Sequence, residues 1–395
     1  MSLNPTFKKK INILFISHDG GSGGAEKCLL DLTSRMDKNK FNIYVNIPHK
    51  GYLSEALESN RIPYFIAETA LWLPSPRAWG ARHLLNFFKT LRPRLWSIET
   101  KIQNLDIDLI YSNSITCIDG ALAAYHMNIP HIWHLHENIQ GNQGIKSYLP
   151  LGLSYYITQF FCKNFISVSS KVSSHLLSKK SSINIVHNGV NINKFSYHPN
   201  DCLRKELHID NDTKIIAQIG SLIPAKGLST FIQAAEILLS KHPAKKTIFL
   251  LIGSGPEDFT TTIKEQINRS TFKQYFFLLG QRNDISQIIS NIDILLLCSE
   301  SEGFPRVLIE AMTASKPVIA TRCGGPEDII IDGETGFLVP INNAHVISTK
   351  IKTLLDQPIL AKKMGNNGLH RAMKLYSMEK YIKSIEQVII KVINN

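Results

Sequence analysis

The chain has 395 residues, of which 44% are hydrophobic and 19% charged, and its formal net charge is +12. This length exceeds what one hydrophobic core fills, so two domains are expected, and no apolar run approaches the ~18 residues of a membrane span. Six scattered cysteines without a CxxC pair exclude a zinc ribbon and a disulfide scaffold, and they indicate buried thiols in a reducing cytoplasm.

Strand and helix patterns alternate through the first 190 residues. Strands are predicted at 11–17, 41–47, 109–112, 132–136, 165–169 and 183–187, with helices near 25–36 and from residue 54 onward. The lysines at 8–10 precede an apolar run that is too short for a signal peptide, so this run is predicted to be the first strand. Short strands separated by helices are typical of a doubly wound parallel sheet. The first domain is therefore assigned to residues 1–190.

A second series of strands and helices follows a polar, turn-rich segment, residues 191–212, which is predicted to be the interdomain linker. Strands are predicted at 214–220, 247–252, 276–279, 292–298, 317–320 and 336–339, with a helix from residue 229, so the second domain is assigned to 213–375. Residues 376–395 have helical apolar spacing. The fold class is α/β, with two Rossmann-like doubly wound sheets expected to face each other across a cleft at the carboxyl ends of their strands.

The basic charge is concentrated in the first half of the chain. Residues 1–195 hold 21 Lys and Arg against 12 Asp and Glu. Within this half, segment 71–96 interleaves aromatic residues with cations, as segments that face anionic lipid headgroups do. An amphipathic helix packed on the core gives the same pattern, so both interpretations stay open. No recognised nucleic-acid-binding module is present, so no nucleic-acid partner is expected.

Two glutamates follow the predicted strand at 292–298. Glu302 lies in a glycine-containing turn, and Glu310 lies in the helix that begins near Pro305. The helix start offers unpaired N–H groups, which bind anions, and the two carboxylates can accept hydrogen bonds from different hydroxyls of one polyhydroxy ligand. The plain alternative is one solvated glutamate and one that pairs with a neighbour on the helix.

Two further loops are expected beside the cleft. The loop from Ser17 to Lys27 contains Gly20, Gly21, Gly23 and Gly24, whose backbone can approach a ligand closely, but it does not fit the dinucleotide fingerprint. The loop from Gly220 to Gly227 contains Lys226, which can act as a point charge against phosphate although the order of a P-loop is absent. An ordinary surface lysine is the alternative for Lys226.

Histidines cluster at the end of the predicted strand 132–136. Alternation puts His134 and His136 on one face of the strand and His131 on the other, so these three make a poor metal triad. A histidine at the carboxyl edge can exchange a hydrogen bond with a substrate hydroxyl. A purely structural role is the alternative.

The chain resembles the group 1 glycosyltransferases, which are the retaining nucleotide-sugar enzymes of glycosyltransferase family 4 with the two-domain GT-B architecture. The motifs that carry the resemblance span nearly the whole chain and are densest in the second domain; they are Gly23-Gly24-Ala25-Glu26, Gly220 through Gly227, Leu251 through Pro256, Leu279 through Ile285, Ser299 through Met312, Lys316 through Ala320 and Gly324 through Pro340.

The resemblance implies a role for each matching residue. Glu310 would bind the nucleotide ribose and Glu302 the donor sugar, around which Gly303, Phe304 and Pro305 form the turn. Lys226 would neutralise the diphosphate, over which Gly23 and Gly24 would close. His136 would contact a donor-sugar hydroxyl close to the reacting carbon, and Arg282 would lie near the nucleotide. On this resemblance, residues 376–395 should return to pack on the first domain.

Two positions depart from the family pattern. Ser221 stands where many members have an arginine beside the diphosphate, so Arg282, Arg306 or backbone N–H groups would have to compensate. Asp328 stands where a glutamate is frequent, which makes donor preference less certain.

The expected function is that of a retaining glycosyltransferase that moves a sugar from a nucleoside diphosphate, with UDP as the family's commonest carrier, to a glycan or lipid-linked acceptor in cell-envelope polysaccharide or lipopolysaccharide biosynthesis. His136, Glu302 and Lys226 are the predicted catalytic residues. No metal or other cofactor is expected, because no DxD-type triplet stands at a loop. The expected location is cytoplasmic, at the inner face of the membrane if segment 71–96 contacts it. A nucleotide-sugar 2-epimerase and a non-catalytic sugar or membrane-surface binder are the alternatives.

Overall fold

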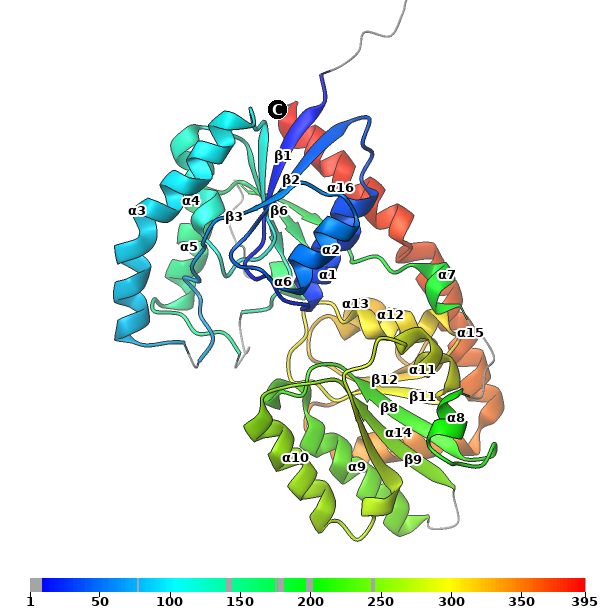
Figure 1. Cartoon of the computed structure of the whole chain (residues 1–395). Coiled ribbons are helices and arrows are strands. Elements are labelled where there is room, and N and C mark those ends of the chain that lie inside the picture. Colours follow the sequence, from blue (N-terminus) through cyan, green and yellow to red (C-terminus); the bar gives the residue numbers. More distant parts are fainter. Residues whose placement is uncertain are drawn as a thin grey trace, which may run out of the picture. The chain divides into compact units, whose positions relative to one another are not determined.

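The computed structural model describes residues 9–76, 78–139, 144–174, 176, 181–196, 202–242 and 246–394. The chain forms two compact units, one from Met1–His187 with Tyr381–Asn395 and the other from Asn188–Lys380. Both are parallel-sheet α/β units (Figure 1). The predicted fold class of two doubly wound parallel sheets is confirmed.

The first unit is built on a seven-stranded parallel sheet in the order β3-β2-β1-β4-β5-β6-β7. Its strands are β1 (Ile11–Ile16), β2 (Phe41–Ile47), β3 (Tyr64–Ile66), β4 (Leu109–Ser112), β5 (His131–Leu135), β6 (Asn164–Ser167) and β7 (Ser182–Ile185). Ile13, Leu14 and Phe15 of β1 are fully buried. Such a continuous apolar run is typical of a strand that helices cover on both faces of the sheet.

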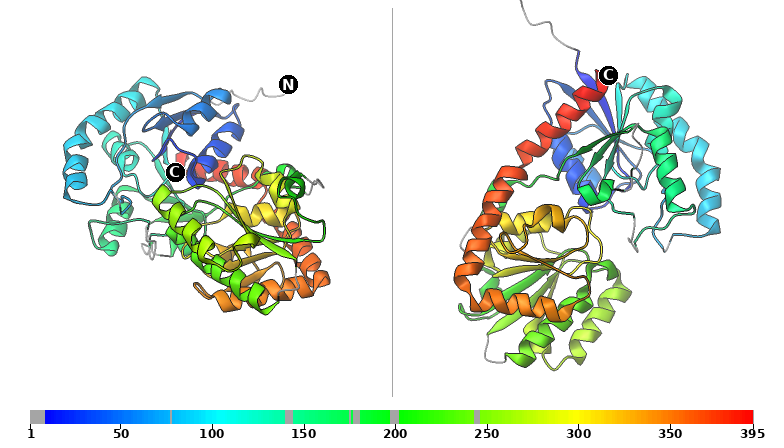
Figure 2. Two further views of the ribbon diagram at one scale, coloured as in Figure 1. Left: turned by 60° about the horizontal axis from the view of Figure 1, so that its bottom comes forward. Right: turned by 180° about the vertical axis from the view of Figure 1, so that it is seen from behind.

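Helices lie on both faces of this sheet (Figure 2). They are α1 (Gly24–Arg35), α2 (Tyr52–Ser59), α3 (Ala81–Asn104), α4 (Asp119–Met127), α5 (Leu151–Phe161), the short α6 (Ser170–Ser173) and the C-terminal α16 (Met378–Ile393). Helices α1 and α2 contact each other, and α4 contacts both α3 and α5. Helix α3 connects β3 to β4, and α5 connects β5 to β6. Because these strands are parallel, each connecting helix runs back along the sheet and begins near the carboxyl edge.

The second unit is built on a six-stranded parallel sheet in the order β10-β9-β8-β11-β12-β13. Its strands are β8 (Lys214–Ile219), β9 (Thr247–Ile252), β10 (Phe276–Gly280), β11 (Ile294–Leu297), β12 (Val318–Thr321) and β13 (Phe337–Val339). Its helices are α7 (Ile192–Phe195), α8 (Cys202–Glu206), α9 (Leu228–Lys241), α10 (Glu257–Arg269), α11 (Ile285–Asn291), α12 (Arg306–Thr313), α13 (Pro326–Ile329), α14 (Ala344–Asp356) and α15 (Pro358–Leu375), with 3-10 turns η1 (Pro224–Lys226) and η2 (Lys273–Tyr275).

The segment predicted to be a linker contains regular structure. Helix α7 contacts α11 and α12, and α8 contacts α11, so these parts of residues 191–212 pack into the second unit. Residues 197–201 of the predicted linker lie outside the described residues. At the other end of the chain, α16 belongs to the first unit from Tyr381 onward, where the Asp37 N–H donates to Glu386 Oε1 at 2.8 Å.

Segment 71–96 both packs on the core and faces solvent. On α3, Phe87 is buried whereas Leu85, Phe88 and Trp96 are more than half exposed. Arg94 is 4% exposed and forms a bidentate ion pair with Asp119 of α4, so its charge is matched inside the unit. The predicted helix is therefore amphipathic, but it leaves large apolar side chains in water. Arg77 of this segment lies outside the described residues.

Five of the six cysteines, Cys28, Cys117, Cys162, Cys298 and Cys323, are buried, in line with the expectation, whereas Cys202 is exposed. No helix in the described part of the chain is long and apolar enough to cross a membrane.

Candidate active site

The turn after β11 carries Glu302 at the carboxyl edge of the second sheet. Its N–H donates to the Cys323 carbonyl at 3.1 Å, and the Gly325 N–H donates to the Glu302 carbonyl at 2.9 Å, so the turn is tied to the loop that follows β12. Helix α12 begins at Arg306, directly after this turn, and Glu310 lies half-buried on it. The two glutamates therefore come from a turn and a helix.

The carboxylate of Glu302 is held by two neighbours. Lys226 Nζ donates to Glu302 Oε1 at 2.6 Å, and Ser299 Oγ donates to the same oxygen at 2.6 Å. The side chains of Lys226 and Glu302 are only 24% and 10% exposed, so their attraction is screened less than that of a surface pair. The structure thus brings together the residues predicted to bind the diphosphate and the sugar.

The backbone around Lys226 is fixed by a buried amide. Gln218 Nε2 donates to the Lys226 carbonyl at 2.6 Å, and Gln218 Oε1 accepts from the Cys298 N–H at 3.2 Å. Gly227 has φ of +62°, and a Cβ there would lie 2.0 Å from the Cys298 carbonyl oxygen. Only glycine allows this approach. The loops that carry Lys226 and Glu302 are therefore in direct backbone contact.

The rest of the turn around Glu302 is packed rather than open. Phe304 is 6% exposed, and its ring meets Tyr376 edge to face with centroids 5.6 Å apart. Pro305 is buried and is the N-cap of α12, while Gly303 is half-buried. This packing positions the turn and the start of α12.

Arg282 and Ser221 differ in what they offer a phosphate. Arg282 binds Glu206 of α8 at 2.9 Å and Asp284 at 2.8 Å, and these two carboxylates raise the pKa of its guanidinium, Asp284 more than Glu206. The charge of Arg282 is thus already matched by two carboxylates within its own unit. Ser221 is exposed in the loop after β8.

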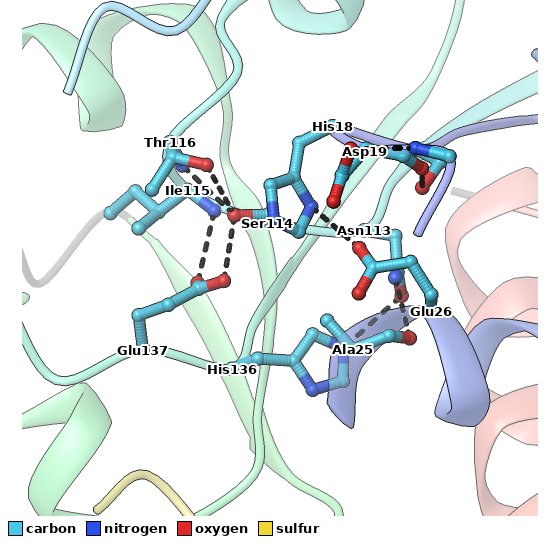
Figure 3. Close-up of polar contacts among 12 residues, drawn as sticks. His18, Asp19, Ala25, Glu26, Asn113, Ser114, Ile115, Thr116, His136 and Glu137 are labelled. Carbon is cyan, nitrogen blue, oxygen red and sulfur yellow. Dashed lines mark hydrogen bonds and ion pairs between the residues drawn. The ribbon is translucent and has the colours of Figure 1, made fainter. Parts of the chain in front are cut away.

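The first unit has its own polar cluster, which surrounds the start of α1 (Figure 3). Gly23 is the N-cap of α1 and Gly24 its first residue. A Cβ on Gly23 would lie 2.4 Å from Glu26 Oε2, so the absent side chain leaves room for that carboxylate, whereas a Cβ on Gly24 would meet nothing. Glu26 is 3% exposed, and burial raises its pKa to about 7.

Two carboxylates lie near His18, which follows β1; Glu26 is buried and Glu137 is half-buried. His18 Nδ1 faces Glu26 Oε1 at 3.1 Å as an ion pair that is not aligned as a hydrogen bond. Glu137, after β5, accepts from Ser114 Oγ at 2.7 Å. Burial raises the pKa of Glu137, and the charge of His18 opposes this shift.

His136 is held in one tautomer by Asn113. Asn113 Nδ2 donates to the Ala25 carbonyl at 3.0 Å, so Asn113 Oδ1 must accept from His136 Nε2, which lies 3.1 Å away (Figure 3). The neutral ring then carries its proton on Nε2, and Nδ1 is its acceptor. Asn113 is 1% exposed. It therefore links His136 to the helix start that carries Glu26.

The other two histidines, His131 and His134 of β5, are buried among side chains of the first unit. The His134 ring lies 4.0 Å from that of His136, and its Nδ1 contacts the Tyr111 hydroxyl at 2.8 Å. His131 contacts Ser112 Oγ at 2.9 Å, and burial lowers the pKa of His131 to about 3. Among the described residues, no group of three His, Cys, Asp or Glu could hold a metal ion.

Replacing Glu26 with glutamine is expected to change how stability depends on pH. The pKa of Glu26 is about 7 in the folded chain and near its ordinary value of 4.5 when unfolded, so the wild type should lose stability as pH rises through this range. The loss should be on the order of 2 kcal/mol, and Glu26→Gln should abolish it. Urea unfolding at pH 5 and pH 8 measures the difference; equal pH dependence in both proteins would contradict the assignment.

Sequence reasoning did not select Gln218, Asn113, His18, Glu26 or Glu137. The last three lay in loops or motifs that it did consider, and a titratable side chain after a strand, as for His18 and Glu137, or in the first turn of a helix, as for Glu26, was a usable signal. Gln218 and Asn113 are uncharged side chains at strand ends, and nothing in a single sequence marks them.

Comparison with known proteins agrees with this architecture. Residues 22–194 match the family model for glycosyltransferase family 4, and residues 200–371 match the model for glycosyl transferases group 1. The fold and the two matches define a glycosyltransferase of the GT-B class. The chain belongs to the group 1 glycosyltransferases.

Individual relatives are similar over most of their length. An uncharacterized glycosyltransferase of Methanocaldococcus jannaschii is 29% identical over 78% of this chain and 80% of its own. The N,N'-diacetylbacillosaminyl-diphospho-undecaprenol alpha-1,3-N-acetylgalactosaminyltransferase of Campylobacter jejuni is 25% identical over 96% and 99%. The crystal structure of Anabaena HepE with UDP-glucose superposes with a TM-score of 0.81 at 22% identity, covering 96% of this chain and all of that one, and this likeness shows the shared fold.

Proposed function

We propose that the chain is a retaining glycosyltransferase that moves a sugar from a nucleoside diphosphate to a glycan or lipid-linked acceptor. The contact between Lys226 and Glu302 carries this proposal. It puts an ammonium and a carboxylate 2.6 Å apart at the carboxyl edge of the second sheet. A nucleoside-diphosphate sugar has an anionic diphosphate next to a hydroxyl-rich sugar ring. The ammonium can neutralise the diphosphate, and the carboxylate can accept hydrogen bonds from the sugar hydroxyls.

Binding of the donor would exchange the partners of these two residues. The diphosphate would replace Glu302 as the partner of Lys226, and the released carboxylate would accept hydrogen bonds from the sugar. As the bond to the phosphate breaks, negative charge develops on the leaving group, where Lys226 and the N–H groups at the start of α12 would stabilise it. Arg282 is paired with Glu206 and Asp284, so this proposal leaves it out of phosphate binding.

The first unit would supply the group beside the reacting carbon. His136, with its proton fixed on Nε2 by Asn113, would accept a hydrogen bond from a donor-sugar hydroxyl through Nδ1. No nucleophile is assigned, so the acceptor hydroxyl would attack on the face that the phosphate leaves, and the phosphate would take its proton. The reaction needs no metal, and a chelator is expected to leave the rate unchanged.

The relatives suggest a donor and an acceptor. UDP-glucose is bound in the HepE structure, and the Campylobacter relative is named for a diphospho-undecaprenol acceptor. We therefore favour a UDP-sugar, a lipid-linked acceptor of envelope polysaccharide or lipopolysaccharide synthesis, and a cytoplasmic enzyme working at the inner face of the membrane. The exposed cations and aromatic residues of segment 71–96 support contact with an anionic lipid surface.

A ligand screen followed by product analysis tests the proposal. UDP, GDP, ADP and their common sugars would first be compared by the rise in melting temperature, because a ligand of the folded state stabilises it by mass action. The best donor would then be incubated with lipid-linked saccharides, and release of the free nucleotide would be followed. Stabilisation by no nucleotide would contradict the proposal. Conversion of the donor without any acceptor would favour an epimerase instead.

Glu310→Ala is expected to weaken donor binding. A carboxylate that accepts from the ribose hydroxyls contributes about 1.5–3 kcal/mol, so the Kd for the nucleotide should rise about 10- to 100-fold. Calorimetry with the preferred nucleoside diphosphate measures this change. Unchanged affinity would remove Glu310 from the nucleotide site.

A further inference from the structure

Helix α5 of the first unit has its polarity inverted. Its exposed side carries Leu153, Tyr156 and Phe160, which are 45%, 65% and 55% exposed. Its buried side carries the hydroxyls of Ser154 and Thr158, which are 2% and 0% exposed. A surface helix of a globular protein normally buries its apolar side chains and exposes its polar ones.

The exposed residues form one continuous stripe. Leu153, Tyr156 and Phe160 are spaced by three and four residues, which places them along one side of α5, and the exposed Leu149 lies two residues before the helix begins. A groove of about 1740 Å³ runs beside this stripe, lined in part by Tyr155, Tyr156 and Phe160, and it enlarges the apolar surface.

Tyr148 joins the start of α5 to the start of α3. Its hydroxyl donates to the Gly80 carbonyl at 3.0 Å and contacts His83 Nδ1 at 3.0 Å. Its ring stacks on Trp79 and on His83 with interplanar angles of 15° and 13°. Trp79, itself 51% exposed, therefore continues the apolar stripe of α5. Trp79, Leu149, Leu153, Tyr156 and Phe160 are called the apolar face below.

The segments of the first unit that contain this face are basic in sequence. Residues 69–98 and 138–187 together contain ten Lys and Arg and no Asp or Glu. Lys146 and Lys163 stand exposed on either side of α5, and Arg82 and Lys89 are exposed on α3. An anionic lipid surface attracts such cationic side chains. A second copy of this chain would instead bring like charges together.

We propose that the apolar face inserts into the headgroup region of an anionic phospholipid bilayer, with α5 lying in the plane of the interface. The charge-free α5, flanked by lysines, provides the apolar insertion, and the surrounding cations contact lipid phosphates. Because α3 and α5 both begin at the carboxyl edge of the first sheet, this contact would bring the bilayer beside the polar cluster of His18 and His136. This inference rests on the proposed function and deepens it, because it assigns the membrane contact to α5 and Trp79. The pattern of segment 71–96 alone would assign the contact to the whole length of α3.

Vesicle binding tests the apolar face without donor or acceptor. The full chain is expected to float with phosphatidylcholine vesicles that contain phosphatidylglycerol and to stay behind with phosphatidylcholine alone. The combined variant Leu153→Ser, Tyr156→Ser, Phe160→Ser should bind more than about tenfold more weakly, since the three side chains would no longer bury apolar surface in the bilayer. The matched control Ile359→Ser, Met373→Ser removes exposed apolar residues of α15 and should bind like the wild type. Equal binding by both variants would overturn the proposal.

Tryptophan emission locates the contact. Transfer of Trp79 into the headgroup region should shift the emission of the wild type to shorter wavelength on vesicle addition. Trp79→Phe should lose this shift, while Trp96→Phe, which changes a residue 69% exposed on the second half of α3, should keep it. If Trp96→Phe lost the shift and Trp79→Phe kept it, the membrane contact would lie along α3, and the assignment to α5 would be overturned. Melting temperatures close to that of the wild type would show that the variants are folded.

The outcomes separate this inference from the proposed function. A chain that binds the phosphatidylglycerol vesicles but no nucleotide would keep the apolar face and lose the glycosyltransferase proposal. A chain that binds and uses a UDP-sugar but does not bind the vesicles would keep the glycosyltransferase proposal and overturn the membrane assignment of the apolar face. A dimer in solution that the α5 variant dissociates would identify a second copy as the occupant and would overturn the membrane assignment.

Discussion

Replacing His136 with alanine is expected to lower kcat by about 10²–10³-fold and to leave the Kd for the nucleoside diphosphate unchanged. The proposed contact of His136 is with the donor sugar beside the reacting carbon, whereas the nucleotide is assigned to the second unit. Steady-state rates with the preferred donor and calorimetry with the free nucleotide measure the two quantities. His126→Ala, which removes an exposed histidine of α4, is the matched control and should retain activity.

Asn113→Asp provides a sharper test of the same site. Aspartate cannot donate to the Ala25 carbonyl, and its negative charge would favour the imidazolium form of His136. If the neutral ring is the active form, the acidic limb of the pH–kcat profile should move upward by about one pH unit. A uniform loss of rate at every pH would instead indicate that Asn113 only maintains the local structure.

Replacing Glu302 with glutamine is expected to have opposite effects on nucleotide binding and on turnover. Without the carboxylate at 2.6 Å, Lys226 has no charged competitor there, so free UDP should bind about 3- to 10-fold more tightly. The sugar would lose its charged acceptor, so kcat for the UDP-sugar should fall about 10²-fold. Calorimetry with UDP and initial rates with the UDP-sugar give both numbers.

Two controls support this measurement. Glu257→Gln removes one negative charge from the exposed start of α10 and should change neither quantity, which separates the local effect from net charge. Lys226→Met should weaken UDP binding, because the proposed partner of the diphosphate is gone. If Glu302→Gln weakened UDP binding as well, exchange of partners between Lys226 and Glu302 would be excluded.

The sheets could be predicted from the sequence because their strands are short, apolar and separated by helices. Segments 41–47, 109–112 and 247–252 match β2, β4 and β9 to the residue. The edge strand β3 was missed, because Tyr64–Ile66 has three residues and is too short to show a period. The regular structure in 191–212 was missed for a similar reason, since α7 and α8 have four and five residues and are stabilised by packing against α11 and α12.

The chemistry of the site was only partly accessible from sequence. Lys226 and Glu302 could each be selected from motif and position, but their contact spans 76 residues and depends on how β8 and β11 pair. The tautomer of His136 depends on Asn113 and on the Ala25 carbonyl, and a backbone acceptor leaves no mark in the sequence. The inverted polarity of α5 appears only when burial is known, because its composition alone fits a core helix as well.

The contact of Gly227 with the Cys298 carbonyl bears on directed evolution of donor choice. Because the two loops touch through their backbones, an insertion or deletion in either would displace both Lys226 and Glu302. Libraries that change loop length should therefore yield inactive proteins, and useful diversity should come from exposed side chains on the same loops. Ser221 is one such exposed position, and arginine there would add a cation to the loop that carries Lys226.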